Sequence, residues 1–225
     1  MTDTKTALLV GASGLVGGHC LQFLLDEPSY TRVTVLVRKP LYVTHEKLVQ
    51  HTINFDDLTT FGEVLAADDV FCCLGTTIKK AGTQEAFRKV DFDYPIKIAA
   101  LTEHCGAAQF LLVSSIGADS HSRIFYNRVK GEMEEAIRKI SFTTVHIFRP
   151  ALLLGDRTEY RAGEKAGAFI MSGLKFALAG PFKKYRAIQA RDVAKTMVRT
   201  AQMNLCGINI FESQRIQEIA DGVDI

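Results

Sequence analysis

Two residues whose side chains can exchange protons, Tyr126 and Lys130, lie four positions apart in a stretch with a helical pattern. Side chains at positions i and i+4 share one face of a helix, which places the phenol beside the ammonium. A free phenol ionises near pH ~10, and a neighbouring cation favours its ionised form. The pair therefore predicts proton transfer at a substrate oxygen, as in the reduction of a carbonyl group. The alternatives are a half-buried tyrosine of an amphipathic helix and a solvated lysine.

Two serines, Ser114 and Ser115, precede this pair and end an apolar run that is typical of a buried strand. A serine hydroxyl at such a place can hold the substrate oxygen by a hydrogen bond while the tyrosine supplies the proton. Adjacent residues of a strand point to opposite faces, so one of the two serines is expected to do so. The sequence leaves open which one.

A glycine-rich turn follows the first apolar run of the chain and opens a helical pattern. Its sequence is Gly11-Ala12-Ser13-Gly14-Leu15-Val16-Gly17-Gly18. In a dinucleotide site, one glycine permits the tight turn, a second lets the backbone approach the pyrophosphate, and a third lets the helix pack against the strand. The N–H groups at the helix N-terminus then bind the phosphates. We predict a dinucleotide coenzyme here, with Gly11, Gly14 and Gly17 as the three glycines; a turn without a ligand is the alternative.

The end of the second predicted strand selects between the two nicotinamide coenzymes. The chain reads Val37-Arg38-Lys39-Pro40 there, with two cations and no acid. An acidic side chain would accept a bond from the ribose hydroxyl of NAD, whereas a guanidinium pairs with the extra phosphate of NADP. We therefore predict NADP(H), held by Arg38 and Lys39. A solvated basic turn is the alternative.

Two further stretches are expected beside this coenzyme. Asp56 follows the third predicted strand and can accept a bond from the adenine amino group, as can its neighbour Asp57. Leu74, Gly75 and Thr76 follow the fourth predicted strand, where small residues let a ligand pass close to the backbone.

The elements that must position these residues alternate along residues 1–150. The expected strands are Ala7–Val10, Val33–Val37, Leu48–Asn54, Asp69–Leu74, Phe110–Ser114 and Thr143–Phe148. The expected helices are Leu15–Leu25, Phe61–Ala66, Gln84–His104 and Phe125–Ile140. Nearly continuous apolar runs indicate strands buried on both faces, and the alternation predicts an α/β fold with a doubly wound parallel sheet. Ligands bind at the carboxyl edge of such a sheet.

The alternation loosens after Pro150. Helical patterns at 166–178 and 191–203, a strand-like run at Ile208–Phe211 and a short final helix remain. We expect a single domain over residues 1–225, in which residues 1–150 form the coenzyme-binding core and residues 151–225 a small substrate lobe over the carboxyl edge.

The composition limits the classes of partner. The 225 residues carry 27 basic and 25 acidic side chains, a net charge of +2, which gives no overall field for a nucleic acid or an anionic membrane. The five cysteines show no zinc spacing, so no metal site is expected, and they are interpreted as reduced thiols. No export signal is evident, so a cytoplasmic protein is expected.

Several distinctive strings resemble a known family, and the similarity extends over nearly the whole chain. They are Gly11-Ala12-Ser13-Gly14, Phe71-Cys72-Cys73-Leu74-Gly75-Thr76-Thr77, Lys79-Lys80-Ala81-Gly82, Val90-Asp91-Phe92-Asp93-Tyr94, Ser114-Ser115-Ile116-Gly117-Ala118-Asp119, Val129-Lys130-Gly131-Glu132 and Phe148-Arg149-Pro150. With them the chain resembles the atypical short-chain dehydrogenases/reductases, and more narrowly the Tat-interactive-protein oxidoreductases.

This resemblance implies a Rossmann-type, NAD(P)-binding fold that holds NADPH, with Tyr126 as proton donor and Lys130 as the ribose-binding lysine. It also implies that Leu153 lines the nicotinamide side and that Arg161 is a further coenzyme contact. The other implied contacts are Ser13, Gly14, Leu15, Val16, Arg38, Lys39, Leu74 and Gly75. One position departs from the pattern: many short-chain reductases have asparagine where this chain has Asp91, and an acid cannot reproduce the same proton relay.

Three functions follow as expectations. The first is NADPH-dependent reduction of a small carbonyl substrate, with Tyr126, Lys130 and Ser114 or Ser115 as catalytic residues. The second is an NADPH-loaded regulator with little turnover that acts through a protein partner. A nucleotide-sugar epimerase ranks last, because the region after Pro150 is short. Either a monomer or a homodimer fits the sequence.

Overall fold

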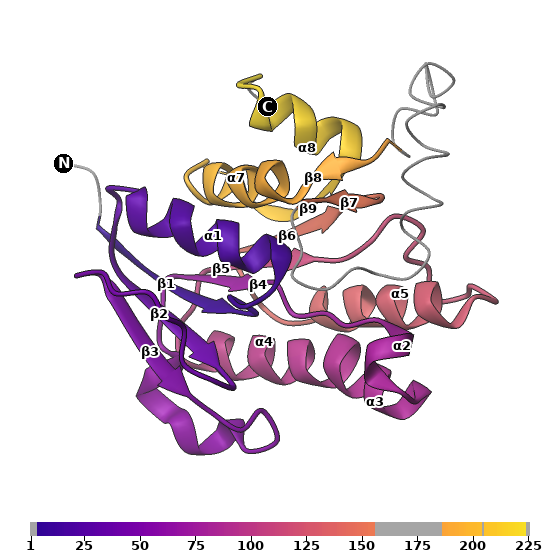
Figure 1. Ribbon diagram of the computed structural model, residues 1–225, viewed down its shortest axis with the longest axis horizontal. Coiled ribbons are helices and arrows are strands. Elements are labelled where there is room, and N and C mark those ends of the chain that lie inside the picture. The colour runs from indigo at the N-terminus through magenta and orange to yellow at the C-terminus, as the bar shows by residue number, and fades with distance from the viewer. Residues whose placement is uncertain (1–3, 156–185, 204, 224–225) are drawn as a thin grey trace.

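The protein is built on one seven-stranded parallel sheet with the strand order β3-β2-β1-β4-β5-β6-β9 (Figure 1). The computed structural model describes residues 4–155, 186–203 and 205–223, without the side chains of residues 59–61. The strands are β1 Lys5–Val10, β2 Tyr30–Val37, β3 Leu48–Thr52, β4 Asp69–Cys72, β5 Gln109–Val113, β6 Thr144–Arg149 and β9 Gly207–Glu212. A separate parallel pair joins β7 Leu153–Leu154 to β8 Ile188–Gln189. The predicted doubly wound α/β fold is confirmed.

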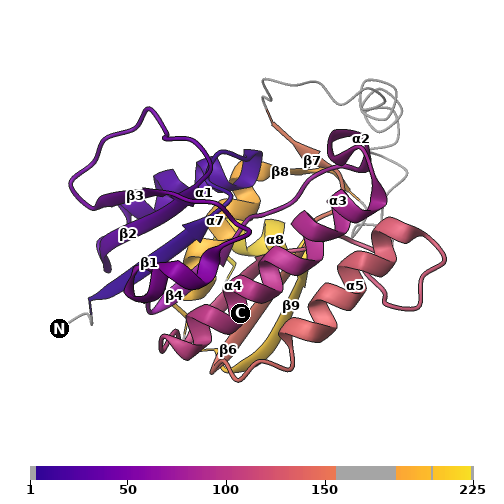
Figure 2. The ribbon, with the colours of Figure 1, turned by 90° about the horizontal axis from the view of Figure 1, so that it is seen from below.

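Helices cover both faces of the sheet. On one face α7 (Ala190–Ala201) packs beside α1 (Leu15–Asp26), and α8 (Ser213–Ala220) lies against α7. On the other face α4 (Tyr94–His104) lies beside α5 (Phe125–Ile137), as Figure 2 shows. The shorter elements are the 3-10 helix η1 Leu58–Leu65, α2 Ile78–Ala81, α3 Gln84–Arg88 and the π-helical turn η2 Lys89–Asp93.

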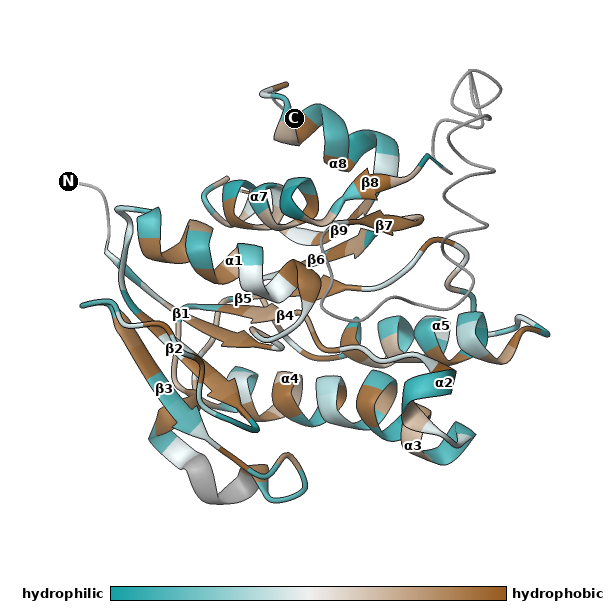
Figure 3. Ribbon diagram, viewed as in Figure 1, coloured by the Kyte–Doolittle hydropathy of each residue, from teal (hydrophilic) through white to brown (hydrophobic). Residues whose placement is uncertain are grey.

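The strands are apolar along their whole length because each face of the sheet has its own core. In β1, Ala7 and Leu9 belong to the core under α1 and α7, whereas Leu8 and Val10 belong to the core under α4 and α5. All four side chains are fully buried. Figure 3 shows the same division, with hydrophobic strands between helices that turn hydrophilic residues outward. This is the pattern of a parallel sheet covered on both sides.

Two expected helices differ in the structure. The predicted helix Gln84–His104 is interrupted by the π-helical turn Lys89–Asp93, which divides it into α3 and α4. The predicted helix Phe61–Ala66 is part of a 3-10 helix that kinks at Gly62, where φ is 33°. The helical pattern at 166–178 lies outside the described residues.

The C-terminal segment takes part in the main sheet, which the sequence pattern did not indicate. β9 pairs with β6 as the seventh strand, and α7 fills the layer beside α1. β9 is an edge strand with one buried face, on which Phe211 joins the core while Ile208 and Ile210 remain exposed. The placement of a substrate lobe over residues 151–225 stays a prediction. In the part of the chain that the structure describes, no helix has both the length and the apolarity that a membrane span requires.

Candidate functional site

The turn between β1 and α1 passes so close to the neighbouring strand that glycine is required. Gly11 has φ +84°, and a Cβ there would lie 2.5 Å from the carbonyl oxygen of Cys73, just after β4. A Cβ on Gly17 would lie 2.1 Å from the Gly11 oxygen, so this glycine lets α1 pack against the turn. The N–H of Gly14 donates to the same oxygen at 2.9 Å, which closes the turn. Two of the predicted glycine roles, the tight turn and the close packing, thus have a steric cause.

The N-terminus of α1 has no side-chain cap among the described residues. Gly14 is its N-cap, and the first turn holds no acidic residue. Ser13 and Gly14 are exposed, whereas the Val16 side chain is buried in the core, so Val16 can offer a ligand its backbone N–H alone. Leu15 is half-buried against the same core. The unsatisfied N–H groups and the helix dipole make this turn suited to a phosphate.

A cleft of about 390 Å³ opens beside this turn at the carboxyl edge of the sheet. Its lining includes the predicted coenzyme residues Gly11, Ser13, Gly14, Arg38, Leu74, Gly75 and Thr76. Among the described residues that line the cleft, two are cations, Arg38 and Lys80, and none carries a carboxylate. Such a lining suits a ligand with several negative charges. Lys80 was not predicted; it follows the strand end Leu74–Thr77 and could have been found from that position.

Other predicted coenzyme residues lie outside this lining. Lys39 is exposed, and Leu153 in β7 is half-buried against the core under α1. Arg161 lies outside the described residues. Leu15, Val16, Gly17, Asp56, Tyr126 and Lys130 are also absent from the lining of this cleft.

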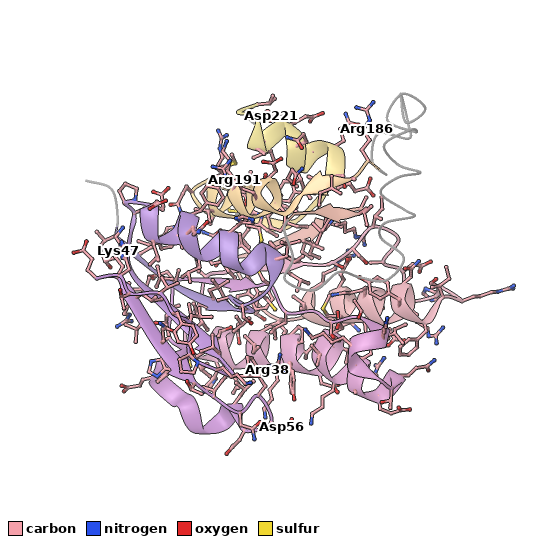
Figure 4. The ribbon with its side chains drawn as sticks, viewed as in Figure 1. Arg38, Lys47, Asp56, Arg186, Arg191 and Asp221 are labelled. Atoms are coloured by element: carbon pink, nitrogen blue, oxygen red, sulfur yellow. The ribbon has the colours of Figure 1, made fainter. Side chains whose placement is uncertain are left out.

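Asp56 contacts Tyr94, a residue of the cleft lining, and is engaged by two neighbouring side chains. It accepts a hydrogen bond from the Tyr94 hydroxyl at 2.8 Å and forms an ion pair with Lys89 at 2.7 Å. The Lys89 ammonium and the Tyr94 hydroxyl hold the pKa of the Asp56 carboxyl below its usual value. Tyr94 lines the cleft, and Figure 4 shows Arg38 and Asp56 in the same part of the molecule, beyond the ends of β2 and β3. An adenine contact at Asp56 stays a prediction.

The proton-transfer pair lies on α5, on the side that faces the other helices of this layer. The Lys130 side chain is 4% exposed, and its Nζ lies 2.9 Å from Oδ1 of Asp91 in η2. The Tyr126 ring is half-buried against Phe87 of α3, with ring centroids 5.5 Å apart. Lys130 is therefore not the solvated cation of the alternative interpretation.

The charge on Lys130 is maintained by its partners. Burial lowers the pKa of Lys130, but the Asp91 carboxylate and the Tyr126 phenol raise this pKa by more, so that it lies above its usual value. Lys130 is thus an ammonium at neutral pH, next to the tyrosine. This is the charge that general acid–base use of a phenol requires.

The two serines have different surroundings. Ser114 is buried, and its hydroxyl donates to Oε1 of Glu134 at 2.6 Å. Glu134 also accepts from the Arg149 Nε at 3.0 Å and pairs with Arg138. The Ser115 Oγ is buried and has no hydrogen-bond partner among the described residues. Ser115 is therefore the serine whose hydroxyl is not engaged by another described residue.

Glu134 was not singled out from the sequence, although a signal was present. Tyr126, Lys130 and Glu134 are spaced at i, i+4 and i+8, so the three side chains form one stripe along α5. The stripe joins α5 to η2 through Asp91 and to the end of β5 through Ser114.

The family model described as NAD(P)H-binding matches residues 11–204, most of the chain. The chain belongs to this NAD(P)H-binding family. Among curated proteins it is 38% identical to Protein HTATIP2 of Rattus norvegicus over 72% of this chain and 68% of that protein. It is 30% identical to Protein FMP52, mitochondrial, of Candida albicans over 90% of each chain. The NAD(P)H-binding protein is thus an atypical short-chain dehydrogenase/reductase, and the resemblance noted from its motifs is confirmed.

The fold is shared with solved structures that include a nucleotide-sugar epimerase and an NAD-bound enzyme. A UDP-N-acetylglucosamine 4-epimerase from Methanobrevibacter ruminantium superposes with a TM-score of 0.69 at 14% identity, over 96% of this chain and 81% of that one. The WbmH enzyme of Bordetella bronchiseptica, in complex with NAD+, gives 0.69 at 15% identity, over 97% and 79%. At such identities the likeness extends to the fold alone.

The expected cytoplasmic location is contradicted. The FMP52 proteins of Candida albicans, Aspergillus clavatus and Emericella nidulans are all named mitochondrial. The expectation rested on the lack of an evident export signal, which does not distinguish between compartments inside the cell.

Proposed function

We propose that this protein is an NADPH-dependent reductase of a small carbonyl compound. The observation that carries the proposal is the buried ammonium of Lys130 beside the half-buried phenol of Tyr126, at the same sheet edge as the NAD(P)H cleft. Gly11, Ser13, Gly14, Arg38, Leu74 and Gly75 would hold the coenzyme. Bound there, NADPH would supply a hydride to the carbonyl carbon of the substrate.

The side chains of the protein supply the proton and the orientation. The Tyr126 hydroxyl donates its proton to the carbonyl oxygen, which leaves a hydroxyl on the product and a phenolate that solvent reprotonates. The Ser115 hydroxyl, which has no partner among the described residues, donates a hydrogen bond to the same oxygen. Lys130 stabilises the phenolate by its charge. Ser114 is assigned to holding Glu134 rather than to the substrate.

The preference for NADP over NAD is part of this proposal. Arg38 lines the cleft directly after β2, where a carboxylate would bind the ribose of NAD. A guanidinium there pairs with a phosphate at the same position. Lys39, which is exposed and not part of the lining, is expected to contribute less.

The test is turnover of a panel of aldehydes and ketones by the purified protein with NADPH. We expect oxidation of NADPH with at least one carbonyl class, and its loss in the Tyr126→Phe variant. Tyr42→Phe is the matched control, because Tyr42 is fully exposed and should leave turnover unchanged. Equal rates for wild type and Tyr126→Phe on the best substrate would refute the proton-donor role.

A second candidate function is an NADPH-loaded regulator with little turnover. Asp91 favours it, because a carboxylate that neutralises Lys130 weakens the help that Lys130 gives to the phenolate. In this case binding to a protein partner depends on NADPH. Capture of such a partner should differ between the NADPH-bound and the coenzyme-free protein; equal capture argues against gating by the coenzyme.

A further inference from the structure

Asp91 occupies the centre of the π-helical turn Lys89–Asp93 and connects three parts of the site. Its side chain is 1% exposed. One carboxylate oxygen, Oδ2, accepts from the backbone N–H of Thr76 at 2.8 Å, and the other, Oδ1, faces the Lys130 ammonium at 2.9 Å. A Cβ on Gly75 would lie 3.5 Å from Oδ1 and 4.0 Å from Nζ, so the pair lies directly under the cleft lining. π-turns inside helices recur at functional sites.

A carboxylate does here what an asparagine amide cannot. Oδ2 of Asp91 accepts a hydrogen bond from the backbone, and Oδ1 forms an ion pair with the ammonium of Lys130. An asparagine amide offers one oxygen and would turn its NH2 group toward one of these two partners. The carboxylate also cancels the charge of Lys130, because both side chains are buried and separated by 2.9 Å. An asparagine would leave the full positive charge facing Tyr126. The two residue types therefore differ in electrostatic effect more than in shape.

We propose that Asp91 is a positioning residue that fixes the Lys130 ammonium beneath the cleft and, by neutralising it, moves proton donation by Tyr126 to a higher pH range than an asparagine would allow. The kinetic side of this inference rests on the proposed reductase function; the electrostatic side does not.

Few other charges act at this place in the described part of the chain. Lys130 is influenced by Asp91 of η2, Tyr126 of its own helix and Cys72 at the end of β4. Burial raises the pKa of the Cys72 thiol to about 12, so the thiol is neutral in the working range. Arg88 of α3 and Glu132 of α5 are paired with each other. Lys89 of η2 is paired with Asp56, and Asp93 of the same turn is exposed.

The direct test is the pH dependence of turnover in Asp91→Asn. We expect the midpoint at which reduction is lost on raising the pH to move down by about one unit or more. The matched control is Asp69→Asn, which removes an equally buried carboxylate from a lysine ion pair at the opposite edge of the sheet. Its midpoint should equal that of wild type. An unchanged midpoint in Asp91→Asn, whatever the loss in kcat, would show a merely structural role and overturn the proposal.

A second measurement needs no turnover and separates this inference from the proposed function. Titration of tyrosinate absorbance in the coenzyme-free protein, taken as the difference between each chain and its own Tyr126→Phe counterpart, follows the Tyr126 phenol alone. Asp91→Asn should lower this midpoint as it lowers the kinetic one. If no carbonyl is reduced but the midpoint moves, the reductase proposal fails and the role of Asp91 stands. If carbonyls are reduced but the midpoint does not move, the reductase proposal stands and the role of Asp91 fails.

Two further variants keep the test open if Asp91→Asn does not fold. Asp91→Ser is smaller and also neutral, so it should lower the midpoint too. Asp91→Glu keeps the charge but alters the geometry, so its midpoint should stay near that of wild type even where kcat falls. A lowered midpoint in Asp91→Glu, or an unchanged one in Asp91→Ser, would contradict the assignment to charge.

Discussion

The two edges of the sheet hold the same three residue types in different arrangements. At the carboxyl edge Tyr126 and Asp91 flank Lys130, so the phenol lies beside a cation. At the amino edge Asp69 lies in the middle: it accepts from the Tyr30 hydroxyl at 2.6 Å and pairs with Lys5 at 3.3 Å.

The order of the three groups decides what each trio can do. Burial and the charge of Asp69 both raise the pKa of Tyr30, so this tyrosine keeps its proton at every working pH. Lys5 also donates to the Ala201 carbonyl, which ties the amino-edge trio to the end of α7. The trio at the amino edge therefore stabilises the fold. The carboxyl edge has a cleft and a cation beside the phenol, which suits it to proton transfer.

Removing each hydroxyl gives the largest expected contrast. Tyr126→Phe should lower kcat by about 10²- to 10⁴-fold, the usual value of a positioned acid, with little change in unfolding free energy. Tyr30→Phe should leave kcat unchanged and cost about 1 to 2 kcal/mol, because Asp69 loses a buried hydrogen bond. The measurements are steady-state kinetics and urea unfolding on both variants. The comparison breaks down if Tyr30→Phe reduces kcat as strongly as Tyr126→Phe.

Removing each lysine should change stability unequally. Lys130→Met leaves Asp91 buried without its cation, which typically costs about 3 to 5 kcal/mol. Lys5→Met should cost about 1 kcal/mol, since the Lys5 side chain is 27% exposed. Burial has already raised the pKa of Asp69, so this carboxyl can take up a proton instead. Chemical denaturation of the two variants measures the difference, and equal losses would contradict this account of the two pairs.

Acidification should lower the free energy of unfolding through a histidine that lies between the amino and carboxyl edges of the sheet. His146 in β6 is fully buried against Phe211, and burial lowers its pKa from 6.5 to about 4. Between pH 6.5 and 4 the unfolded chain is therefore protonated at His146, whereas the folded chain keeps this imidazole neutral. The contribution of His146 to the free energy of unfolding is complete above pH 6.5 and is lost as the pH falls toward 4. The loss amounts to about 3 kcal/mol.

His146→Phe isolates this contribution. The variant should flatten the pH dependence of unfolding free energy over that window and leave the effects of both trios in place. Urea unfolding at a series of pH values provides the measurement. A wild-type curve as flat as that of the variant would exclude His146 as the titrating group.

The smallest expected effect is on coenzyme affinity, through the exposed side chain of Arg38 at the carboxyl edge. Arg38→Ala should weaken NADPH binding about tenfold, as for the loss of one charged hydrogen bond, and leave NADH binding unchanged. Lys39→Ala is the matched control and should have a smaller effect, because Lys39 does not line the cleft. Calorimetry measures the affinity of each variant for both coenzymes. An equal loss of affinity for NADH would contradict the assignment of Arg38 to the extra phosphate.

Features that depend on residues close together in the sequence could be predicted from it. The glycine turn at Gly11–Gly17 and the i, i+4 pair on α5 depend on local geometry, and the apolar runs reflect burial on both faces. These patterns were sufficient for the fold class and the position of the cleft, and the distinctive strings, such as Cys72-Cys73-Leu74-Gly75-Thr76-Thr77, were sufficient for the family.

Contacts between distant parts of the chain could not be predicted in this way. The pairing of Asp91 with Lys130 depends on the π-turn, which no local pattern indicated. The engagement of Ser114 by Glu134 of α5 joins residues 20 positions apart, so no local pattern indicated it. The place of β9 beside β6 is set by tertiary packing, since a short apolar run fits either an edge strand or a separate lobe.

The place of α7 beside α1 bears on how the chain can be divided. A fragment that ended at residue 150 would contain every strand of the sheet except β9, together with the whole glycine turn. It would nevertheless expose the apolar flank of α1 that α7 covers, and it would leave β6 as an unprotected edge. We expect such a fragment to aggregate rather than to bind NAD(P)H, and we therefore expect that the first two thirds of this chain cannot fold on their own.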